Sequence, residues 1–267
     1  MKVLIKMKNS KQPLSLDERK SIQLDMLKEI DAFCRAKKIK YSLAFGTLLG
    51  AIRHKGFIPW DDDVDIMMPL PDLLRFKNEF KSEKIEYHDV DNDRYHSFAF
   101  SRLINKQTYS ESGLFFRGEG VAIDLYVCIG IPDNREAFIK GVEPLFNKRM
   151  KAIKNRLRVL SYLPIKTIPL YAKTQKAYRD YLFTNSIPYE RANFYYIIAG
   201  HINLWKLMSY DYDVFNDLVD MQFEGLPCLV TAYYDKFLTQ RYGDYMTPPP
   251  LNEQHPAHGG KYYWNNK

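Results

Sequence analysis

The feature that most constrains this chain is an acidic run in an apolar setting, residues 59–65, Pro-Trp-Asp-Asp-Asp-Val-Asp. Side chains alternate between two faces along a strand, so an extended run directs Asp63 and Asp65 to one face. Asp61 has the same parity but follows a Pro-Trp turn that leaves its direction open, and Asp62 is expected to face elsewhere. Two adjacent carboxylates raise each other's pKa unless a cation lies between them. Mg²⁺ and Mn²⁺ prefer oxygen ligands, and we expect Asp63 and Asp65 to hold one of these ions.

A solvated acidic loop is the competing interpretation of this run. The neighbouring residues argue against it, because charges among apolar side chains require partners. These neighbours are Phe57, Ile58, Trp60, Val64, Ile66 and Met67. The spacing also lacks the pattern of an EF-hand calcium loop.

A third carboxylate is expected to join the first two. Asp124 is the only charged residue in the apolar, strand-like run 120–127. A lone buried carboxylate is costly, so Asp124 should contact a cation or several hydrogen-bond donors. A hydrogen bond to the backbone or to an arginine is the structural alternative. Three carboxylates around one or two metal ions are the arrangement used in two-metal phosphoryl transfer.

A phosphate-binding element is predicted shortly before the acidic run. Gly46 and Thr47 follow a short apolar strand and open a helix, whose N-terminus offers free N–H groups and a positive dipole end to phosphate. Cationic side chains nearby are candidates for phosphate oxygens, with solvated surface positions as the alternative. They are Arg53, Lys55 and Arg102, and His54 is a candidate general base because of its unperturbed pKa.

The order of predicted elements indicates an α+β fold with a mixed sheet in the first half and a mostly helical second half. Ser15 and Glu18 form a capping-box pattern for the first helix. We expect helices at 15–37, 46–52, 71–80 and from 134 onward, and strands at 41–45, 64–68, 97–103, 108–111 and 121–129. The predicted division is a catalytic core, 1–133, and a helical region, 134–267, that packs on it and completes the substrate site. The tail, 252–267, is expected to be a mobile flap or partly disordered.

Composition narrows the class of protein further. The chain has 267 residues and a formal charge of +7, which favours nucleic acid, anionic lipid or small anionic substrates as partners. Three distant cysteines, Cys34, Cys128 and Cys228, form no CxxC pair and suit a reducing cytoplasm. No signal peptide and no spanning segment is expected. The basic stretch 148–158 precedes apolar residues and predicts either peripheral contact at the inner face of a membrane or a solvated helix face.

Two stretches resemble the LicD family of cholinephosphotransferases. The first is residues 46–66, GTLLGAIRHKGFIPWDDDVDI, and the second is residues 242–250, YGDYMTPPP, which is similar to the family's C-terminal signature. The likeness extends from about residue 23 to 258. It implies a nucleotidyltransferase-like fold, with a Gly-Thr turn, an Asp-x-Asp pair and a later lone aspartate on a neighbouring strand. These are Gly46-Thr47, Asp63 with Asp65, and Asp124.

The family resemblance implies a reaction as well. Its members move a phosphorylated alcohol, typically phosphocholine, from a CDP-linked donor to a sugar hydroxyl of a surface glycan such as lipopolysaccharide, teichoic acid or capsule, and release CMP. The acceptor is then a glycan or a lipid-linked oligosaccharide, and no nucleic acid is expected. Aromatic rings favour a choline cation by cation–π attraction, with core packing as the alternative for each. The candidates are Trp60, Tyr242, Tyr245 and Trp264.

Three rival functions remain open from the sequence. A metal-dependent glycosyltransferase also uses an Asp-x-Asp motif, but it would leave UDP or GDP rather than CMP and does not explain Gly46-Thr47. A nucleic-acid nucleotidyltransferase is favoured by the positive charge and would bind RNA in a salt-dependent way. A catalytically inactive binding protein would bind CDP-choline without turnover.

Overall fold

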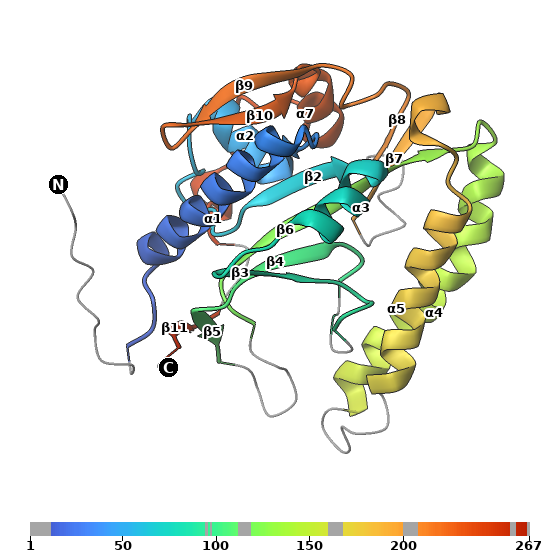
Figure 1. Ribbon diagram of the computed structural model, residues 1–267, viewed down its shortest axis with the longest axis horizontal. Coiled ribbons are helices and arrows are strands. Elements are labelled where there is room, and N and C mark those ends of the chain that lie inside the picture. Colours follow the sequence, from blue (N-terminus) through green and yellow to red (C-terminus); the bar gives the residue numbers. More distant parts are fainter. Residues whose placement is uncertain are drawn as a thin grey trace.

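The computed structural model describes residues 12–93, 96, 98–111, 119–159, 168–199, 208–256 and 260–265. A curled mixed sheet forms the centre, and helices cover both of its faces (Figure 1). The helices are α1 (Leu16–Lys37), α2 (Phe45–Arg53), α3 (Leu70–Glu79), α4 (Arg135–Val159), α5 (Ile168–Thr184) and α7 (Tyr234–Tyr242), with 3-10 turns η1 (Tyr189–Arg191) and η3 (Leu251–Glu253). The strands are β1 (Ser42–Leu43), β2 (Asp65–Pro69), β3 (Ile85–His88), β4 (Ser101–Asn105), β5 (Thr108–Ser110), β6 (Ala122–Ile131), β7 (Phe194–Ile198), β8 (Ser209–Tyr210), β9 (Leu218–Phe223), β10 (Leu226–Thr231) and β11 (Tyr262–Trp264).

The longest strand, β6, organises the seven-stranded sheet. On one side it pairs in parallel with β2, which places Asp65 opposite Asp124. Its other side pairs first with β4 and then with β7, both antiparallel. The strand that the sequence predicted as apolar with one charge is therefore the central strand, and β1, β3 and β8 pair with its neighbours β2, β4 and β7.

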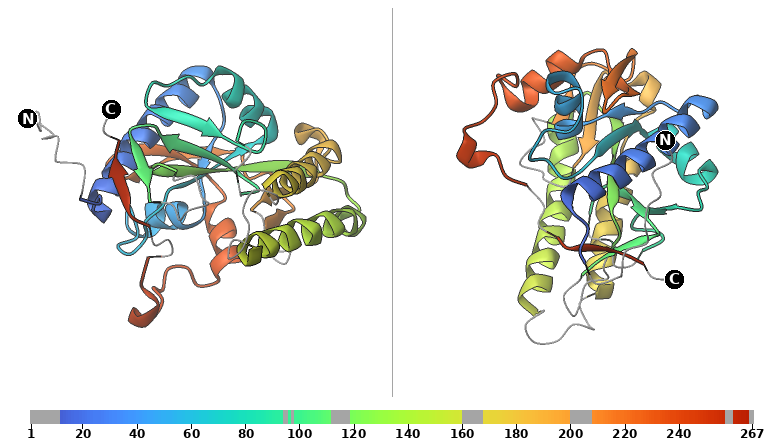
Figure 2. Two further views of the ribbon diagram at one scale, coloured as in Figure 1. Left: turned by 90° about the horizontal axis from the view of Figure 1, so that it is seen from below. Right: turned by 90° about the vertical axis from the view of Figure 1, so that its left-hand side faces the viewer.

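Helices lie on both faces of this sheet. Viewed from below, α1 and α3 lie on one side, while α2 and α7 lie on the other (Figure 2). Helices α4 and α5 pack against each other beside the sheet (Figure 1). The apolar stripe of α1, which includes Ile22, Met26, Leu27 and Ile30, is buried. Burying such a stripe against a sheet is what stabilises a helix of this length.

A hairpin and a short strand complete the arrangement around the acidic run. Strands β9 and β10 join through Glu224 and Gly225, which have φ values of 51° and 77°. Two consecutive residues with positive φ suit the type I′ turn that matches strand twist. Strand β11, near the C-terminus, pairs with β5 and lies beside the beginning of α1 (Figure 2).

The α+β prediction is confirmed, and most elements of the first half lie where they were expected. The capping box of α1 is present, with Glu18 N donating to Ser15 Oγ at 3.2 Å and Ser15 N donating to Glu18 Oε2 at 2.8 Å. The strand expected at 41–45 covers only Ser42–Leu43, because Phe45 already begins α2. Residue 97 of another expected strand lies outside the described residues.

The second half differs more from the prediction. Helices α4, α5 and α7 are present, but β7 and β8 extend the central sheet and β9 and β10 form a separate hairpin. The boundary expected at residue 133 falls between β6 and α4, and β7 returns to pair with β6. The tail expected to be mobile contains η3 and β11.

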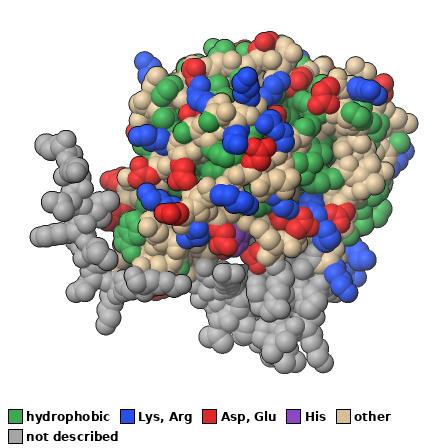
Figure 3. Space-filling view, in the orientation of Figure 1, with side chains coloured by type: hydrophobic (Ala, Val, Ile, Leu, Met, Phe, Trp, Pro, Cys, Tyr) green, Lys and Arg blue, Asp and Glu red, His purple; other side chains and the backbone are tan. Residues whose placement is uncertain are grey.

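Several bulk expectations bear on partners. The three cysteines are free and buried. No helix among the described residues is long and apolar enough to cross a membrane. Lys and Arg side chains are interspersed with Asp and Glu on the face shown in Figure 3. Within the basic stretch, Arg149 is buried and lies over the ring of Tyr178 at 5.6 Å, so it is not part of a basic surface. The side chains of residues 153–159 and all of 160–167 lie outside the described part.

Candidate active site

The loop that carries the aspartates is fixed at both of its sides. Lys55 has a φ of 58°, and its carbonyl accepts a hydrogen bond from Glu224 N at 2.9 Å. The Glu224 carboxylate in turn accepts from Phe57 N at 2.9 Å. From α1, Lys20 Nζ donates to the carbonyls of Ile58 and Pro59 at 3.3 and 3.2 Å. The hairpin turn and the first helix therefore present the acidic run from a held loop.

The N-terminus of α2 is attached directly to this run. Asp65 N donates to Thr47 Oγ1 at 2.8 Å, and Ala44 N donates to Asp65 O at 2.9 Å. The first-turn N–H groups of a helix have no partner within the helix itself. In α2, no side chain of the N-cap residue Ala44 satisfies them either. A Cβ atom at Gly46 would lie 2.7 Å from Asp61 Oδ2, and only glycine permits this approach. A phosphate at this helix end would therefore meet the acidic run.

One residue at this junction adopts an uncommon backbone conformation. Phe45 has a φ of 44°, although it is not a glycine. Its buried ring packs edge-on against Tyr126, with 4.8 Å between ring centroids. Left-handed conformations of bulky residues cost free energy and cluster at functional sites. The ring contact helps to hold the strained start of α2.

The third carboxylate lies beside the second but is engaged by an arginine. Asp65, Asp124 and Arg102 occupy one row across β2, β6 and β4. Arg102 Nε donates to Asp124 Oδ1 at 2.8 Å, and its terminal nitrogen forms an ion pair with Glu119. Phe98 lies 4.8 Å from the guanidinium. Both the predicted proximity of Asp124 to Asp65 and the alternative of an arginine partner are found.

The aspartates of the run are short of positive charge. Burial raises the pKa of Asp61, and burial followed by repulsion from Asp61 raises the pKa of Asp63 to about 8. Burial and then repulsion from Asp63 and Asp124 raise the pKa of Asp65 well above its usual range. Asp65 Oδ1 is buried and has no hydrogen-bond partner among the described residues. By contrast, Asp62 forms an ion pair with Arg19 at 3.3 Å, and it lines the same cleft wall as Asp63.

A divalent cation fits these residues by the chemistry of the donor set. Asp63 and Asp65 offer hard oxygen atoms, and the partnerless Asp65 Oδ1 can be satisfied by a cation. A cation would also relieve the repulsion that raises the pKa values. Within the described residues, however, no three His, Cys, Asp or Glu side chains already converge as metal ligands. Metal binding by Asp63, Asp65 and Asp124 stays a prediction.

A cleft adjoins the acidic run on the side of Asp62 and Asp63. It contains about 660 Å³ of empty space, open solvent included. Its walls come from α1, the acidic run, the strand pair β4–β6 and the C-terminal strand. The lining residues are Arg19, Gln23, Asp62, Asp63, Phe98, Arg102, Val121, Ala122, Asp124 and Tyr262.

Several residues predicted for the site lie elsewhere around it. Arg53 donates to the carbonyl of Tyr245 at 2.6 Å, and the Tyr245 hydroxyl donates to Asp235 at 2.7 Å. His54 lies edge-on to Trp60, with 6.4 Å between ring centroids. Burial and the neighbouring arginine lower the pKa of His54, which keeps it neutral at pH 7. Lys55 and Tyr242 are exposed. None of the residues named in this paragraph is part of the described cleft wall.

The structure adds residues that the sequence did not indicate. Arg19, Lys20 and Gln23 approach the acidic run from α1, and Tyr262 approaches it from β11. Gln23 carried a signal, since a glutamine next to Ile22 stands at the edge of the apolar stripe of α1. Tyr262 carried none, because a local sequence pattern does not show that the C-terminal strand returns to the cleft.

Comparison with known proteins finds a family model and a relative of nearly full length. Residues 38–170 match the family model described as LicD/FKTN/FKRP, nucleotidyltransferase domain. The chain is 30% identical over 262 residues to a protein of Haemophilus influenzae named lipopolysaccharide cholinephosphotransferase LicD, and the match covers 92% of this chain and 96% of that protein.

Two shorter similarities point to smaller regions. An uncharacterised protein of Rickettsia typhi is 40% identical over 63 residues, 23% of this chain and 20% of its own length. An uncharacterised protein of Rickettsia prowazekii is 45% identical over 49 residues, 18% of each chain.

Proposed function

Because this chain belongs to the LicD family, we propose that it transfers a phospho-alcohol, with phosphocholine favoured, from a CDP-linked donor to a sugar hydroxyl of a bacterial cell-surface glycan. The observation that carries the proposal is the hydrogen bond between Thr47, in the first turn of α2, and Asp65. This bond attaches the helix N-terminus to undercompensated aspartates, by which we mean aspartates whose pKa values are raised by burial and mutual repulsion. One side of this arrangement attracts phosphate and the other attracts a divalent cation. The similarity to a lipopolysaccharide cholinephosphotransferase over nearly its whole length supports the same reaction class.

The donor diphosphate is assigned to the N-terminus of α2. Gly46 lets the carboxylate of Asp61 approach the backbone of the first turn, and the first-turn N–H groups would donate to phosphate oxygens. Asp63 and Asp65, with Asp124 beside them, would hold Mg²⁺ or Mn²⁺. Such an ion, when bound, neutralises charge that develops on the diphosphate. Lys55 and Arg53 remain candidate cations for the departing phosphate.

The bond changes follow from this placement. The oxygen of a sugar hydroxyl forms a bond to the phosphorus that carries the alcohol, the bond from that phosphorus to the CMP oxygen breaks, and CMP leaves with the electron pair. The hydroxyl proton passes to a base. Asp124 borders the cleft, while His54 is neutral at pH 7 and able to accept a proton, so these two residues are the rival bases.

The favoured alcohol is choline, and its cage is proposed from rings around the site. Trp60 lies in the loop after α2, Tyr242 is the last residue of α7, and Tyr245 follows that helix, all outside the described cleft wall. A quaternary ammonium group is attracted to such rings by about 0.5–2 kcal/mol each. Replacing Trp60 by leucine is expected to weaken CDP-choline more than CDP-glycerol, which has no cation.

A product assay tests the proposed function. The protein is incubated with Mg²⁺, a glycan acceptor and a panel of CDP-choline, CDP-ethanolamine, CDP-glycerol and CDP-ribitol, and CMP release and glycan phosphorus are followed by ³¹P NMR. We expect CMP and a new phosphodiester signal on the glycan. Release of UDP or GDP from nucleotide sugars, with no CMP from any CDP-alcohol, would contradict the proposal and favour the glycosyltransferase alternative.

Peripheral membrane contact through the basic stretch is a separate proposal. Lys148 and Lys151 precede the part of α4 whose side chains are not described, and Arg149 is buried against α5. Co-sedimentation with anionic vesicles at low salt tests it. Binding that disappears at high salt is expected, and no binding at low salt contradicts it.

A further inference from the structure

A buried amide beside the cleft has one side satisfied and one side free. Gln23 is only 4% exposed. Its Nε2 donates to the carbonyls of Ala122 and Asp62 at 3.1 and 3.4 Å. Carbonyls only accept hydrogen bonds, so the nitrogen must face them, and this fixes the orientation of the amide. Gln23 Oε1 is buried and has no donor among the described residues. A ligand that donates a hydrogen bond would complete it.

The cleft around this amide has the composition of a small-molecule site. Tyr262 and Phe98 supply aromatic surfaces, and each ring has a guanidinium against it. Arg19 lies 5.3 Å from the ring of Tyr262, and Arg102 lies 4.8 Å from that of Phe98. Five of the ten lining residues are charged, so the cleft suits a polar ligand that also offers a face to the two rings.

The tyrosine is held in place by its backbone. Its carbonyl accepts from Leu14 N at 2.6 Å, and β11 pairs with β5. Asn265 donates through its side chain to the carbonyls of Lys106 and Thr108 at 2.8 and 3.3 Å. The side chain of Tyr262 can therefore change without loss of the strand that carries it.

The position of the cleft decides which substrate it receives. The cleft wall contains Asp62, Asp63 and Asp124, whereas Asp61 and Asp65 contact the N-terminus of α2. The acidic run thus separates the cleft from α2. In phosphoryl transfer the attacking and leaving oxygens lie roughly in line on opposite sides of phosphorus. If the departing nucleotide phosphate lies at α2, the attacking hydroxyl enters from the cleft.

We propose that this cleft is the subsite for the acceptor sugar, and that Gln23 Oε1 accepts a hydrogen bond from one of its hydroxyl groups. The sugar ring packs on Tyr262, and its reacting hydroxyl faces Asp124 and the acidic run. The inference rests on the proposed function for the position of the donor phosphate. The buried oxygen rejects ligands without a donor at that point, because it would then stay unpaired.

Gln23→Met tests the subsite, since methionine keeps the length of the side chain and removes the acceptor, together with the two Nε2 hydrogen bonds to Asp62 and Ala122. Gln240→Met is the matched control. This variant removes a partly buried side-chain hydrogen bond, which Gln240 Nε2 donates to the carbonyl of Ser209 at 3.0 Å. Gln240 is not part of the described cleft wall. Steady-state kinetics with CDP-choline and methyl glucoside or methyl galactoside give the KM of each substrate. Saturation-transfer NMR measures binding of the same glycosides and, separately, of CMP.

We expect Gln23→Met to raise the KM for the glycoside roughly tenfold, with the KM for CDP-choline, CMP binding and donor hydrolysis by water unchanged. Gln240→Met should leave both KM values unchanged. If Gln23→Met weakens CMP but not the glycoside, the cleft belongs to the nucleotide and the proposal fails. Unchanged binding of both probes, or no glycoside binding by the wild-type protein, also overturns it.

A second variant covers the case in which Gln23→Met does not fold. Tyr262→Ala should show the same rise in glycoside KM, and Tyr262→Phe, which keeps the ring, should remain close to wild type. Equal KM values for all three proteins overturn the proposal. The proposed function can fail while the cleft proposal holds. This would be the result if the wild-type protein released no CMP from any CDP-alcohol but bound glycosides in a way that depends on Gln23.

Discussion

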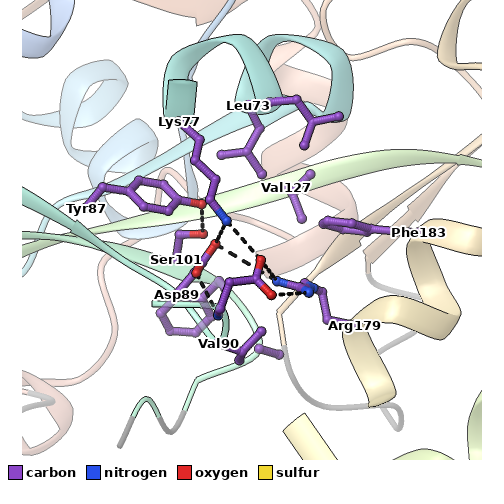
Figure 4. A pocket seen from close by; sticks show the side chains of 13 residues that line it. Leu73, Lys77, Tyr87, Asp89, Val90, Ser101, Val127, Arg179 and Phe183 are labelled. Atoms are coloured by element: carbon purple, nitrogen blue, oxygen red, sulfur yellow. Dashed lines mark hydrogen bonds and ion pairs between the residues drawn. The ribbon is translucent and has the colours of Figure 1, made fainter. Parts of the chain in front are cut away.

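Two groups of aspartates lie next to two strands of the same sheet, β2 and β3, which β6 and β4 separate, and the groups differ in how many cationic side chains bind them. After β3, Asp91 is surrounded by cations from two helices. Arg179 binds it through two nitrogens at 2.6 and 2.8 Å, Lys77 at 2.9 Å and Lys176 at 2.8 Å. Lys77 also reaches Asp89 at 2.6 Å. Figure 4 shows Lys77 and Arg179 converging on this group from different elements.

The second group, before β2, has the opposite balance. The hydrogen bonds from Arg179 lower the pKa of Asp91, whereas burial and mutual repulsion raise the pKa values of Asp63 and Asp65. The group after β3 is bound by Lys77, Lys176 and Arg179 of the chain itself. These ion pairs join α3, the β3–β4 connection and α5. In the acidic run, Asp65 Oδ1 has no hydrogen-bond partner among the described residues, and a bound cation would supply one. The comparison separates a structural cluster from a candidate catalytic one, although both are acidic.

The cavity beside the compensated group supports the same distinction. It contains about 570 Å³ of empty space, open solvent included, and its wall holds Lys77 and Arg179. Both cations already bind carboxylates of the chain, so they do not offer an unpaired charge to a ligand. The proposed function therefore uses the aspartates before β2, and not this cavity.

The largest expected effect is a fall in kcat when a carboxylate of the acidic run is removed. Asp65→Asn keeps the shape of the side chain and removes its charge, and we expect kcat to fall about 100-fold or more because the metal loses a central ligand. Far-UV circular dichroism checks the fold. Asp91→Asn is the matched control and should retain kcat. If Asp65→Asn keeps more than a few per cent of turnover, roughly 5% of the wild-type rate, the assignment is wrong.

The next effect concerns pH. The folded pKa of Asp63 is raised from 3.8 to about 8, so the stability contributed by its protonated form is complete below pH 3.8 and is lost as the pH rises through about 8. Without metal, Asp63→Asn should therefore exceed the wild-type free energy of unfolding by about 2 kcal/mol at pH 9, and by much less at pH 5. Urea unfolding at the two pH values measures this.

Adding Mg²⁺ provides the control for the unfolding measurements at pH 5 and pH 9. It should stabilise the wild-type protein more at pH 9 than at pH 5, because a cation binds the deprotonated carboxylates. Asp63→Asn should gain less from Mg²⁺. An equal stability difference between the two proteins at both pH values would contradict the role of this carboxyl group.

The compensated group should respond in stability alone. Asp91→Ala leaves three cations without their shared partner, and we expect the free energy of unfolding to fall by about 1–2 kcal/mol, since the group is partly exposed and screened. Urea unfolding measures the fall, and high salt should reduce it. A loss of kcat in a fully folded Asp91→Ala protein would remove the distinction between the groups.

The smallest effect concerns the link between α2 and the acidic run. Thr47→Val keeps the shape of the side chain and removes the oxygen that accepts from Asp65 N. We expect kcat/KM for the CDP-alcohol to fall roughly 3- to 10-fold, because one neutral hydrogen bond contributes about 0.5–1.5 kcal/mol. Thr47→Ser should retain the wild-type value. Equal values for all three proteins would show that the link is not needed.

Local patterns predicted the parts of the fold that local interactions specify. The capping box fixed the start of α1. The apolar run around Asp124 became β6, next to β2. Each of these depends on residues a few positions apart, so a short window of sequence contains the signal. The predicted grouping of Asp63 with Asp65 is not reproduced by the cleft wall, which contains Asp62 and Asp63, because the strand begins only at Asp65.

The remaining parts depend on contacts between distant segments. The β9–β10 hairpin has a Glu-Gly turn instead of the common Asn-Gly signal, and its role is to hold a loop nearly 170 residues earlier, as Glu224 does for Phe57. Gln23 became a cleft residue only through its bonds to Asp62 and Ala122. Nothing within α1 or β11 encodes these partners, so tertiary packing decides them.

Binding of Mn²⁺ tests the central claim most directly, because it asks whether the undercompensated aspartates hold a cation at all. Calorimetric titration of Mn²⁺ into the wild-type protein, Asp65→Asn and Asp91→Asn compares the two groups in one experiment. The account predicts saturable binding to the wild-type protein and to Asp91→Asn, and none to Asp65→Asn. Equal binding to wild-type and Asp65→Asn proteins, or loss of binding only in Asp91→Asn, would contradict it.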